Sequence, residues 1–326
     1  MQAVVGVDVS KEKLDCSWLR DPQTLKVKTK VLKNNHAGIE MLAQWLTKTT
    51  GSSQDEITVV MEATGIYHEK LAYSLFEKGF KVVVANPAQI KAYAKSLGAT
   101  HKTDKQDSLV IARYGASNKP LLWQPEAAEV RQLKSLIARL EAIEKDYQRE
   151  YNRKEKAEFS AVSDVVLESI EKTMDYLNEE KQRLESQIDD HINRHTRLKS
   201  DRKLLESIPG IGRTMSRLML AVIHSRNFEK ASQLAAFLGL IPKHVESGVF
   251  KGRSRLSKTG PSLIRAKLYM ATVCASTCNP DIVKQRARLL ANGKNKMQAL
   301  GAAMRKLTQI CFGVIKSQKE YAPQGG

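Results

Sequence analysis

Hydrophobic residues in the first third of the chain form short runs separated by turn residues. Five of these runs are predicted as strands, at residues 3–9, 14–19, 25–32, 57–61 and 82–84. Apolar residues at helical spacing follow the third, fourth and fifth runs, in segments near residues 39–46, 71–78 and 104–114. Three strands followed by alternating helices and strands are typical of a layered α/β fold. We therefore predict an α/β domain over residues 1–122.

The pattern changes near Glu126, where strand-like runs end and charged helix-forming residues dominate. Two long segments then carry one apolar stripe each: Leu133, Leu136, Ile137, Leu140, Ile143 and Tyr147, and Leu167, Ile170, Met174, Leu177, Leu184 and Ile188. The near-heptad spacing predicts an antiparallel coiled-coil hairpin over residues 123–200. Such stripes pack a chain on itself or on a second copy, so we interpret this segment as a core or an oligomerisation element.

The remaining residues, 201–326, are predicted to form a mostly helical domain. Near its start, Ile208-Pro209-Gly210-Ile211-Gly212 resembles a helix-hairpin-helix. In that motif, glycines permit a tight turn whose backbone N–H groups approach a phosphate. Gly210 and Gly212 are therefore candidate nucleic-acid contacts, although an ordinary turn between two packed helices would use the same residues.

Composition narrows the choice of partners. The 326 residues contain 53 Lys and Arg against 35 Asp and Glu, a formal net charge of +18. Such an excess favours polyanionic partners, with nucleic acid first. A hydrophobic content of 42% excludes wholesale disorder, and four cysteines are too few for a disulfide scaffold. We expect a cytoplasmic protein without a membrane partner, because no apolar run approaches a membrane span. We also expect Cys274 and Cys278 to lie on a buried helix face.

Isolated carboxylates are informative in so basic a chain. Asp8 and Glu62 stand at the ends of two predicted strands, and Asp104 and Asp107 stand near the start of a predicted helix. Thr103, followed three residues later by Gln106, predicts the helix N-cap through a capping box. Because residues three apart share a helix face, the two aspartates should project together.

Strand ends and an adjacent helix start can bring these four acids together. Four converging carboxylates repel one another unless cations neutralise them, and hard oxygen ligands select Mg²⁺, with Mn²⁺ as an alternative. We therefore predict a metal site formed by Asp8, Glu62, Asp104 and Asp107. Each acid taken singly could instead be a turn residue, a solvated residue or a partner of the helix dipole.

A second candidate site lies in the basic segment around Ser247. Ser247 precedes Gly248, and the surrounding cations outnumber the single acid Glu246; they are Lys243, Lys251, Arg253, Arg255, Lys258 and Arg265. This density is typical of phosphate contacts, for which Lys251, Arg253, Arg255 and Lys258 are our candidates. Spacing alone favours Ser247 as a turn residue, because serine is a weak nucleophile without an activating group.

Taken together, these motifs resemble the DEDD transposases of the insertion sequence 110 family. The resemblance covers nearly the whole chain and rests on residues 6–13, 62–65, 86–87, 102–107, 208–212, 238–242, 246–248 and 257–260. It implies an N-terminal RuvC-like, RNase H-type domain, a coiled coil and a C-terminal transposase domain. It also implies that Asp8, Glu62, Asp104 and Asp107 are the catalytic acids that bind magnesium, and that Ser247 is the catalytic nucleophile.

The resemblance implies partners and a reaction as well. It implies target and donor DNA, a structured guide (bridge) RNA that pairs with both, and homodimers that assemble into tetramers. The expected function is RNA-guided, site-specific recombination that inserts and excises a mobile element at the bacterial nucleoid. Two alternatives remain open at this point. One is a metal-dependent junction endonuclease in which Ser247 is a loop residue, and the other is a non-catalytic nucleic-acid-binding scaffold.

Overall fold

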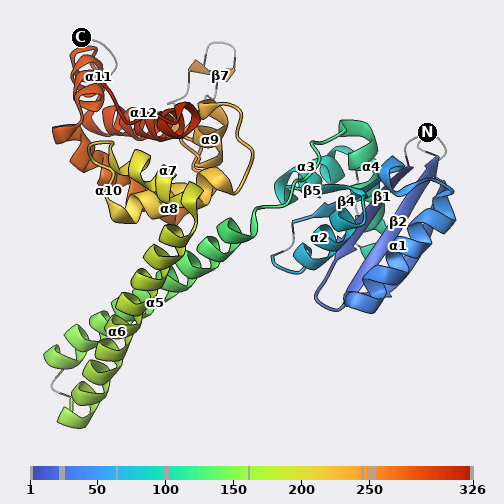
Figure 1. The fold of residues 1–326 in the computed structure, drawn as a ribbon, viewed down its shortest axis with the longest axis horizontal. Helices are drawn as coiled ribbons and strands as arrows, with labels where there is room; N and C mark the ends of the chain where they lie inside the picture. Colours follow the sequence, from blue (N-terminus) through green and yellow to red (C-terminus); the bar gives the residue numbers. More distant parts are fainter. Residues whose placement is uncertain are drawn as a thin grey trace. The chain divides into compact units, whose positions relative to one another are not determined.

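A computed structural model describes residues 3–21, 26–63, 65–98, 103–160, 162–243, 246–247, 250–251 and 255–323 (Figure 1). The chain divides into two compact units, residues 1–125 and residues 126–326. The first unit contains a five-stranded sheet with helices, and the second is almost entirely helical. The predicted change from α/β to helical structure is therefore confirmed, and the segments expected at residues 123–200 and 201–326 share one compact unit.

The sheet of the first unit has the strand order β3-β2-β1-β4-β5. Its strands are β1 (Ala3–Val9), β2 (Lys13–Asp21), β3 (Lys26–Lys33), β4 (Ile57–Glu62) and β5 (Lys81–Ala85). The first three strands pair antiparallel, whereas β4 pairs parallel with both β1 and β5. This mixed sheet is consistent with the RuvC-like fold that the resemblance implied.

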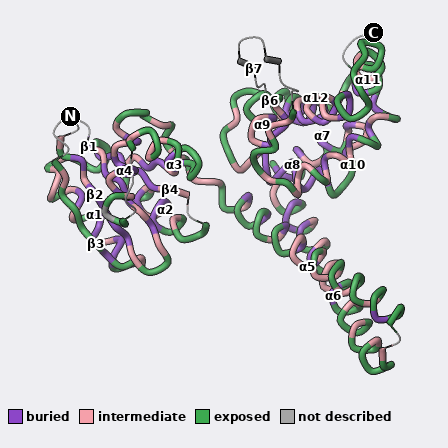
Figure 2. Tube along the Cα trace, turned by 180° about the vertical axis from the view of Figure 1, so that it is seen from behind, coloured by how far each residue is buried: buried purple, intermediate pink, exposed green. Residues whose placement is uncertain are grey.

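Helices cover both faces of this sheet. Leu42 and Leu46 of α1 (His36–Thr50) and Leu71 of α2 (Glu69–Glu77) pack on one face, against Val5 and Val7 of β1. On the other face, α3 (Pro87–Ser96) and α4 (Asp104–Asn118) pack against alternate residues of β4 and β5. Because both faces are covered, burial runs continuously along the central strands: Ile57 to Met61 of β4 are all buried, and such buried stretches are purple in Figure 2.

Close contact between β1 and α4 determines where the acidic residues lie. A Cβ atom on Gly6 would lie 2.2 Å from the Ser108 carbonyl oxygen and 2.4 Å from the Ala112 nitrogen, both in the backbone of α4. One helical turn after Ala112 in α4, a Cβ atom on Gly115 would lie 2.4 Å from the Val60 side chain of β4. The Ser17 and Ser108 hydroxyls, both buried, form a 2.8 Å hydrogen bond between β2 and α4. Small residues therefore let α4 lie directly on the sheet.

Two long helices, α5 (Ala128–Phe159) and α6 (Asp164–Arg194), begin the second unit. They run side by side as an antiparallel hairpin (Figure 1), with Leu133, Ile137 and Leu140 buried on α5 and Leu184 and Ile188 buried on α6. Burial decreases toward the tip, where Phe159 is 96% exposed. The expected helical hairpin is therefore present, with its apolar stripes facing each other over the half next to the helical body.

The helical body of the second unit is held by packing and by buried polar contacts. Its helices are α7 (Thr196–Glu206), α8 (Arg213–His224), α9 (Ala231–Phe237), α10 (Ser262–Cys278), α11 (Pro280–Ala291) and α12 (Lys296–Ser317). Arg217 donates two hydrogen bonds to Asp189, at 3.0 and 2.7 Å, and so joins α8 to α6. Asp201 accepts from Gln318 and is 2.8 Å from His224, and therefore links α7, α8 and the end of α12.

Two short β-pairs interrupt this helical body. β6 (Pro242–Lys243) pairs with β9 (Arg255–Leu256), and β7 (Glu246–Ser247) pairs with β8 (Phe250–Lys251). Both pairs are antiparallel and lie in the basic segment around Ser247. Within the described residues, no helix is both long enough and apolar enough to cross a membrane.

Two details of the sequence analysis need correction. The helix α3 was not predicted, although Asn86 caps it and Pro87 occupies its first turn, a frequent N-terminal arrangement. Cys274 and Cys278 are exposed rather than buried, because α10 buries the neighbouring face that carries Leu268, Thr272 and Ala275. The apolar pattern of α3 was too weak to indicate a helix, and that of α10 was too weak to show which face of the helix is covered.

The contact between β1 and α4 predicts that Gly6→Ala destabilises the first unit by at least about 2 kcal/mol, because the added methyl overlaps backbone atoms of α4. Urea unfolding followed by tryptophan fluorescence measures this unit alone, since Trp18, Trp45 and Trp123 all lie within it. Gly313→Ala, in an exposed position of α12 with open space around it, is the matched control and should leave that transition unchanged. Equal midpoints for Gly6→Ala and the wild type would contradict the prediction.

Candidate active site

Asp8 and Glu62 lie on the α4 side of the sheet. Side chains of a strand alternate between faces, and Val5 and Val7 of β1 face α1, so Asp8 lies on the face that α4 covers. On β4, Val60 packs with the α4 cluster, and Glu62, two residues later, has the same orientation. Because β1 and β4 are parallel neighbours, both acids stand at the same edge of the sheet.

Asp104 and Asp107 occupy the first turn of α4. The side chain of Thr103 accepts a 3.3 Å hydrogen bond from the Gln106 backbone N–H, which confirms Thr103 as the N-cap. This cap starts the helix at Asp104, so that both aspartates stand near its positive end, where the helix dipole stabilises negative charge. Their three-residue spacing places them on one face of α4.

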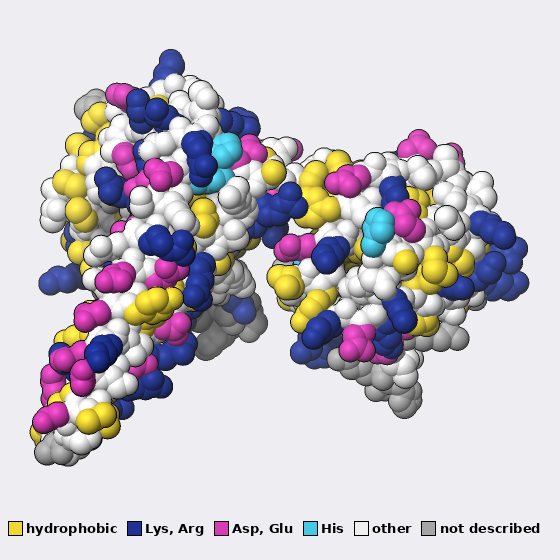
Figure 3. All heavy atoms as spheres, turned by 60° about the horizontal axis from the view of Figure 1, so that its bottom comes forward, with side chains coloured by type: hydrophobic (Ala, Val, Ile, Leu, Met, Phe, Trp, Pro, Cys, Tyr) yellow, Lys and Arg dark blue, Asp and Glu magenta, His cyan; other side chains and the backbone are white. Residues whose placement is uncertain are grey.

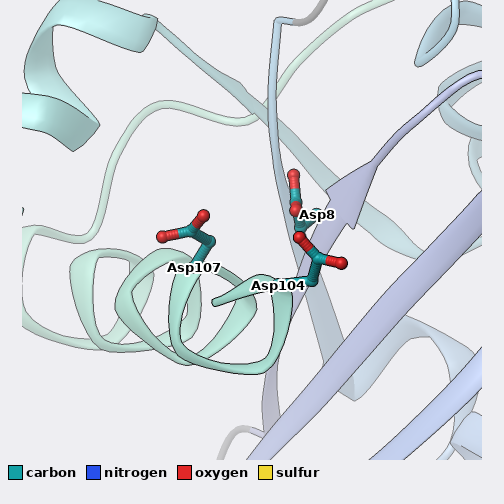
Figure 4. Close-up of side chains that lie close together, drawn as sticks. All are labelled: Asp8, Asp104 and Asp107. Carbon is teal, nitrogen blue, oxygen red and sulfur yellow. The ribbon is translucent and has the colours of Figure 1, made fainter. Parts of the chain in front are cut away.

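Three of the four predicted acids come together. One carboxylate oxygen from each of Asp8, Asp104 and Asp107 lies within 4.8 Å of the other two, and Figure 4 shows the two α4 side chains beside the Asp8 side chain from β1. Asp8 and Asp107 are half-buried, whereas Asp104 is exposed. Three hard oxygen donors at this spacing, from a strand and a helix that are held together by Gly6, fit a divalent cation.

Burial and repulsion by the neighbouring acids change the ionisation of Asp8. Its pKa is raised from 3.8 to about 6, first by burial and then by the negative charges of Asp107 and Asp104, with smaller contributions from Asp15 and Glu62. Burial and the neighbouring acids both disfavour the ionised carboxylate of Asp8, whereas nearby positive charge would favour it. A bound divalent ion would supply that charge, so the electrostatics and the donor geometry agree.

Glu62 lies outside the group of three. It is half-buried at the end of β4, and it is the last of the causes that raise the pKa of Asp8. The strand register therefore brings Glu62 to the same face and edge as Asp8, but its carboxylate is farther from the cluster than those of Asp104 and Asp107. Its assignment as a fourth metal ligand stays a prediction.

Sequence reasoning missed two residues at this site, Lys13 and Asp15. Asp15 stands directly opposite Asp8 in the antiparallel pairing of β1 and β2, and it is only 8% exposed. The Lys13 ammonium lies 3.1 Å from Asp15 and 2.5 Å from Asp104. These contacts raise the pKa of Lys13, through the hydrogen bond to Asp104 first. The signal was available, because Lys13 and Asp15 alternate on a strand that a short turn pairs with the strand of Asp8.

The loops at this edge of the sheet are joined by Asn34. Its side-chain amide donates to the carbonyl of Ser10, at 2.8 Å, and to the carbonyl of Tyr67, at 3.1 Å. Ser10 follows the strand that carries Asp8, and Tyr67 lies in the loop that follows Glu62. Asn34 therefore restrains the two segments from which these acids project.

The second unit carries Ser247 in the β7–β8 hairpin. Ser247 pairs with Phe250, and Glu246 pairs with Lys251, so Ser247 is the last paired residue of β7. Among the cations expected to contact phosphate, Arg255 pairs with Lys243 and is exposed, and Lys258 is exposed in a left-handed conformation. Arg253 lies outside the described residues. Lys and Arg side chains are visible on both units in Figure 3.

Arg265 differs from its neighbours in the basic segment. Its guanidinium donates to the carbonyl oxygens of Gly260, at 2.9 Å, Thr259, at 3.1 Å, and Leu238, at 3.4 Å. These bonds join the end of α9 to the start of α10. Arg265 therefore holds the segment together, although composition alone grouped it with the cations that contact phosphate.

The predicted helix-hairpin-helix is formed by α7, the turn at residues 207–212, and α8. Its two glycines differ in their surroundings. Gly210 has a positive φ of 96°, and a Cβ there would lie 2.5 Å from the Ala275 side chain, so the lack of a side chain serves the packing of α10. Gly212 is the N-cap of α8 and has open space around it. Of the two, Gly212 keeps the geometry expected of a phosphate contact.

Comparison with known proteins agrees with this arrangement. A model of DEDD transposases matches residues 5–157, and a model described as the transposase IS116/IS110/IS902 family matches residues 202–287. Pilin gene-inverting proteins of Moraxella bovis and Moraxella lacunata are each 32% identical to this chain over 320 residues, 97% of either length. The chain belongs to the IS110 family of transposases. An insertion element IS110 protein of Streptomyces coelicolor is 24% identical over 159 residues, which cover 48% of this chain and 38% of that protein.

As a member of the IS110 family, the protein is an enzyme of DNA recombination and transposition. The first family model spans the sheet, α4 and most of α5, and therefore contains the whole acidic cluster. The second begins within α7, continues through α8, α9, the two β-pairs and α10, and ends within α11, and it therefore contains Ser247. The acids and the serine thus belong to different units of an IS110 transposase.

The raised pKa of Asp8 predicts a pH dependence of stability. Below about pH 4, Asp8 is protonated in the folded and the unfolded chain, whereas its ionisation between about pH 4 and pH 6 opposes folding. In the absence of divalent ions, the free energy of unfolding of the wild type should therefore fall, relative to that of Asp8→Asn, as the pH rises from about 4 to about 6. We expect a difference of about 1 kcal/mol, because solvent reaches this half-exposed group and screens the repulsion. Urea unfolding followed by tryptophan fluorescence measures it, and parallel pH profiles for the two proteins would contradict it.

Proposed function

We propose that this IS110-family enzyme is an RNA-guided, site-specific DNA recombinase that cleaves and rejoins DNA through a covalent phosphoserine, with Mg²⁺ bound by the acidic cluster. The observation that carries this proposal is the convergence of Asp8, Asp104 and Asp107. Three carboxylates from separate parts of the chain meet where β1 and α4 touch, and the raised pKa of Asp8, caused by burial first and by the neighbouring acids next, supports a cation there.

The acids would hold Mg²⁺, or Mn²⁺, with Asp8, Asp104 and Asp107 as the nearest ligands and Glu62 as the fourth. When bound, the ion supplies charge stabilisation to a phosphodiester whose negative charge increases during cleavage. The close contact between Gly6 and α4 fixes the backbone positions from which Asp104 and Asp107 project toward Asp8. A rigid ligand set of this kind favours the transition state over the ground state.

Ser247 is the proposed nucleophile. Its Oγ forms a bond to the phosphorus while the bond from phosphorus to the 3′ oxygen breaks; the serine proton is released, and the 3′ oxygen leaves as a hydroxyl. The resulting phosphoserine ester conserves the energy of the phosphodiester. A 3′ hydroxyl from another strand then attacks the same phosphorus and regenerates Ser247. Strand exchange therefore needs no ATP.

Cations near Ser247 would hold the DNA backbone without reading its sequence. Lys251, Arg253, Arg255 and Lys258 are the candidates in this segment, together with the N–H groups at Gly212. If a bridge RNA reads target and donor DNA by base pairing, the protein has to recognise only the shape and the charge of the duplex. The net charge of +18 suits a protein that holds RNA and DNA together.

The proposed assembly is a homodimer that joins a second dimer into a tetramer on DNA, in the bacterial cytoplasm at the nucleoid. The exposed tip of the α5–α6 hairpin supports a role for this hairpin in oligomerisation, since Phe159 and Val165 are 96% and 74% exposed. The names of the Moraxella relatives add gene inversion to insertion and excision, and the same cleavage and rejoining steps would serve all three outcomes.

Replacing the proposed nucleophile tests the phosphoserine. Ser247→Ala should abolish the covalent protein–DNA adduct and reduce strand transfer by at least about 10³-fold, because no other step provides that bond. The measurement is denaturing electrophoresis of labelled DNA incubated with protein, bridge RNA and Mg²⁺. Ser257→Ala, which removes a hydroxyl from the same basic segment, is the matched control and should retain the adduct. Hydrolysed DNA ends without an adduct in the wild type would favour the junction endonuclease instead.

The division of the site between two units predicts complementation between subunits. Asp8→Asn and Ser247→Ala proteins are each expected to be inactive alone. Mixed in one assembly, they should recover part of the strand-transfer activity if an acid cluster of one subunit serves the serine of another. The measurement is strand transfer by the mixture, compared with each variant at the same total concentration. No recovery at any mixing ratio would contradict a site shared between subunits.

A further inference from the structure

Lys13 occupies a defined position beside the acidic cluster. Its ammonium lies between the carboxylates of Asp104 and Asp15, at 2.5 and 3.1 Å, and therefore contacts one carboxylate of the cluster and one outside it. The side chain of Lys13 is 44% exposed, whereas that of Asp15 is 11% exposed. A buried carboxylate on a strand that faces α4 thus fixes a cation next to Asp104.

The register of the sheet explains why the ammonium lies there. Asp15 is the cross-strand partner of Asp8, and Lys13 is two residues away on the same face of β2. The hydrogen bond between Ser17 and Ser108, two residues farther along the strand, holds β2 against α4. Three successive residues on one face of β2, Lys13, Asp15 and Ser17, therefore align this strand with the helix that carries Asp104.

The arrangement has the form of a two-cation site with one cation already supplied by the protein. Two-metal phosphodiester enzymes hold their ions roughly 3.5–4 Å apart. Here Asp104 belongs both to the three-acid group and to the pair that holds Lys13, so one carboxylate serves two adjacent cation positions. The first position is lined by Asp8, Asp104 and Asp107, and the second, between Asp104 and Asp15, contains the ammonium.

We propose that Lys13 is a built-in second cation, which contacts Asp104 and limits the acidic cluster to one divalent ion. The proposal rests on the metal-dependent function proposed above and adds the number of ions. Lys13 is a positioning residue in this scheme, because it acts on the metal through Asp104. The ammonium remains in its position when the divalent ion leaves, so the cluster keeps part of its neutralising charge between reaction cycles.

Removing the ammonium should open the second position. The test is titration of the full-length protein with Mn²⁺, with free Mn²⁺ measured by electron paramagnetic resonance. The wild type should bind one ion per chain, and Lys13→Met should bind two. The first ion should also bind at least about tenfold more tightly in Lys13→Met, because a positive charge within a few ångströms of the site has been removed. Lys13→Arg keeps the charge and should bind one ion.

Lys33→Met is the matched control. Lys33 is the cross-strand partner of Lys13 on β3 and is exposed, and within the described part of the chain it forms no ion pair. The Lys33→Met substitution removes the same charge from a neighbouring position, so the Lys33→Met protein should bind one ion with wild-type affinity. Tryptophan fluorescence shows whether each variant keeps the fold of the first unit, and the measurement uses only variants whose unfolding transition remains cooperative.

The outcomes separate this proposal from the function on which it rests. Two ions in the wild type, or one ion of unchanged affinity in Lys13→Met, would overturn the role of Lys13 and leave the metal-dependent function intact. A tenfold gain in Lys33→Met as well would also overturn it, since the effect would then be general surface charge. If the wild type binds no Mn²⁺ with or without DNA, the proposed metal-dependent function itself fails.

Discussion

Repulsion between carboxylates brought together at one edge of a sheet is the physical constraint on which this protein depends. Asp8, Asp104 and Asp107 can approach one another only because α4 lies directly on β1, and that contact exists because position 6 has no side chain. The raised pKa of Asp8 reflects the unfavourable energy of this arrangement. Cations relieve it, and the protein supplies one of them, Lys13, from its own second strand.

The same constraint explains why the acids and Ser247 belong to different parts of the chain. Under the proposed function, the acids would need a rigid support, which the sheet and α4 provide, whereas a serine nucleophile would have to reach different DNA strands in turn. A two-stranded hairpin in a basic segment of the helical unit suits that second task. The two family models place the acids and Ser247 in different units of one IS110-family recombinase, and under the proposed function assembly on DNA would control when they act together.

Several residues had other roles than their local sequence indicated. The lack of a side chain at Gly210 provides space for α10, while its assignment as a phosphate contact stays a prediction, and Arg265, in the basic segment, binds backbone carbonyls. Cys274 and Cys278 are exposed, against expectation. In each case the residue type allows the role that the local sequence suggested. The residues that it contacts in the folded protein, however, lie far away in the chain.

The sequence by itself determined the order of strands and helices in the first unit except for α3, the N-cap at Thr103, the helical hairpin and the family, because these depend on local hydrophobic spacing and on short motifs. Only the tertiary structure decided which acids meet, and how closely. It placed Glu62 outside the group of three, and it added Lys13 and Asp15 through the register of β1 and β2. The physical reason is that charge interactions depend on distance through space, whereas a one-dimensional pattern contains only distance along the chain.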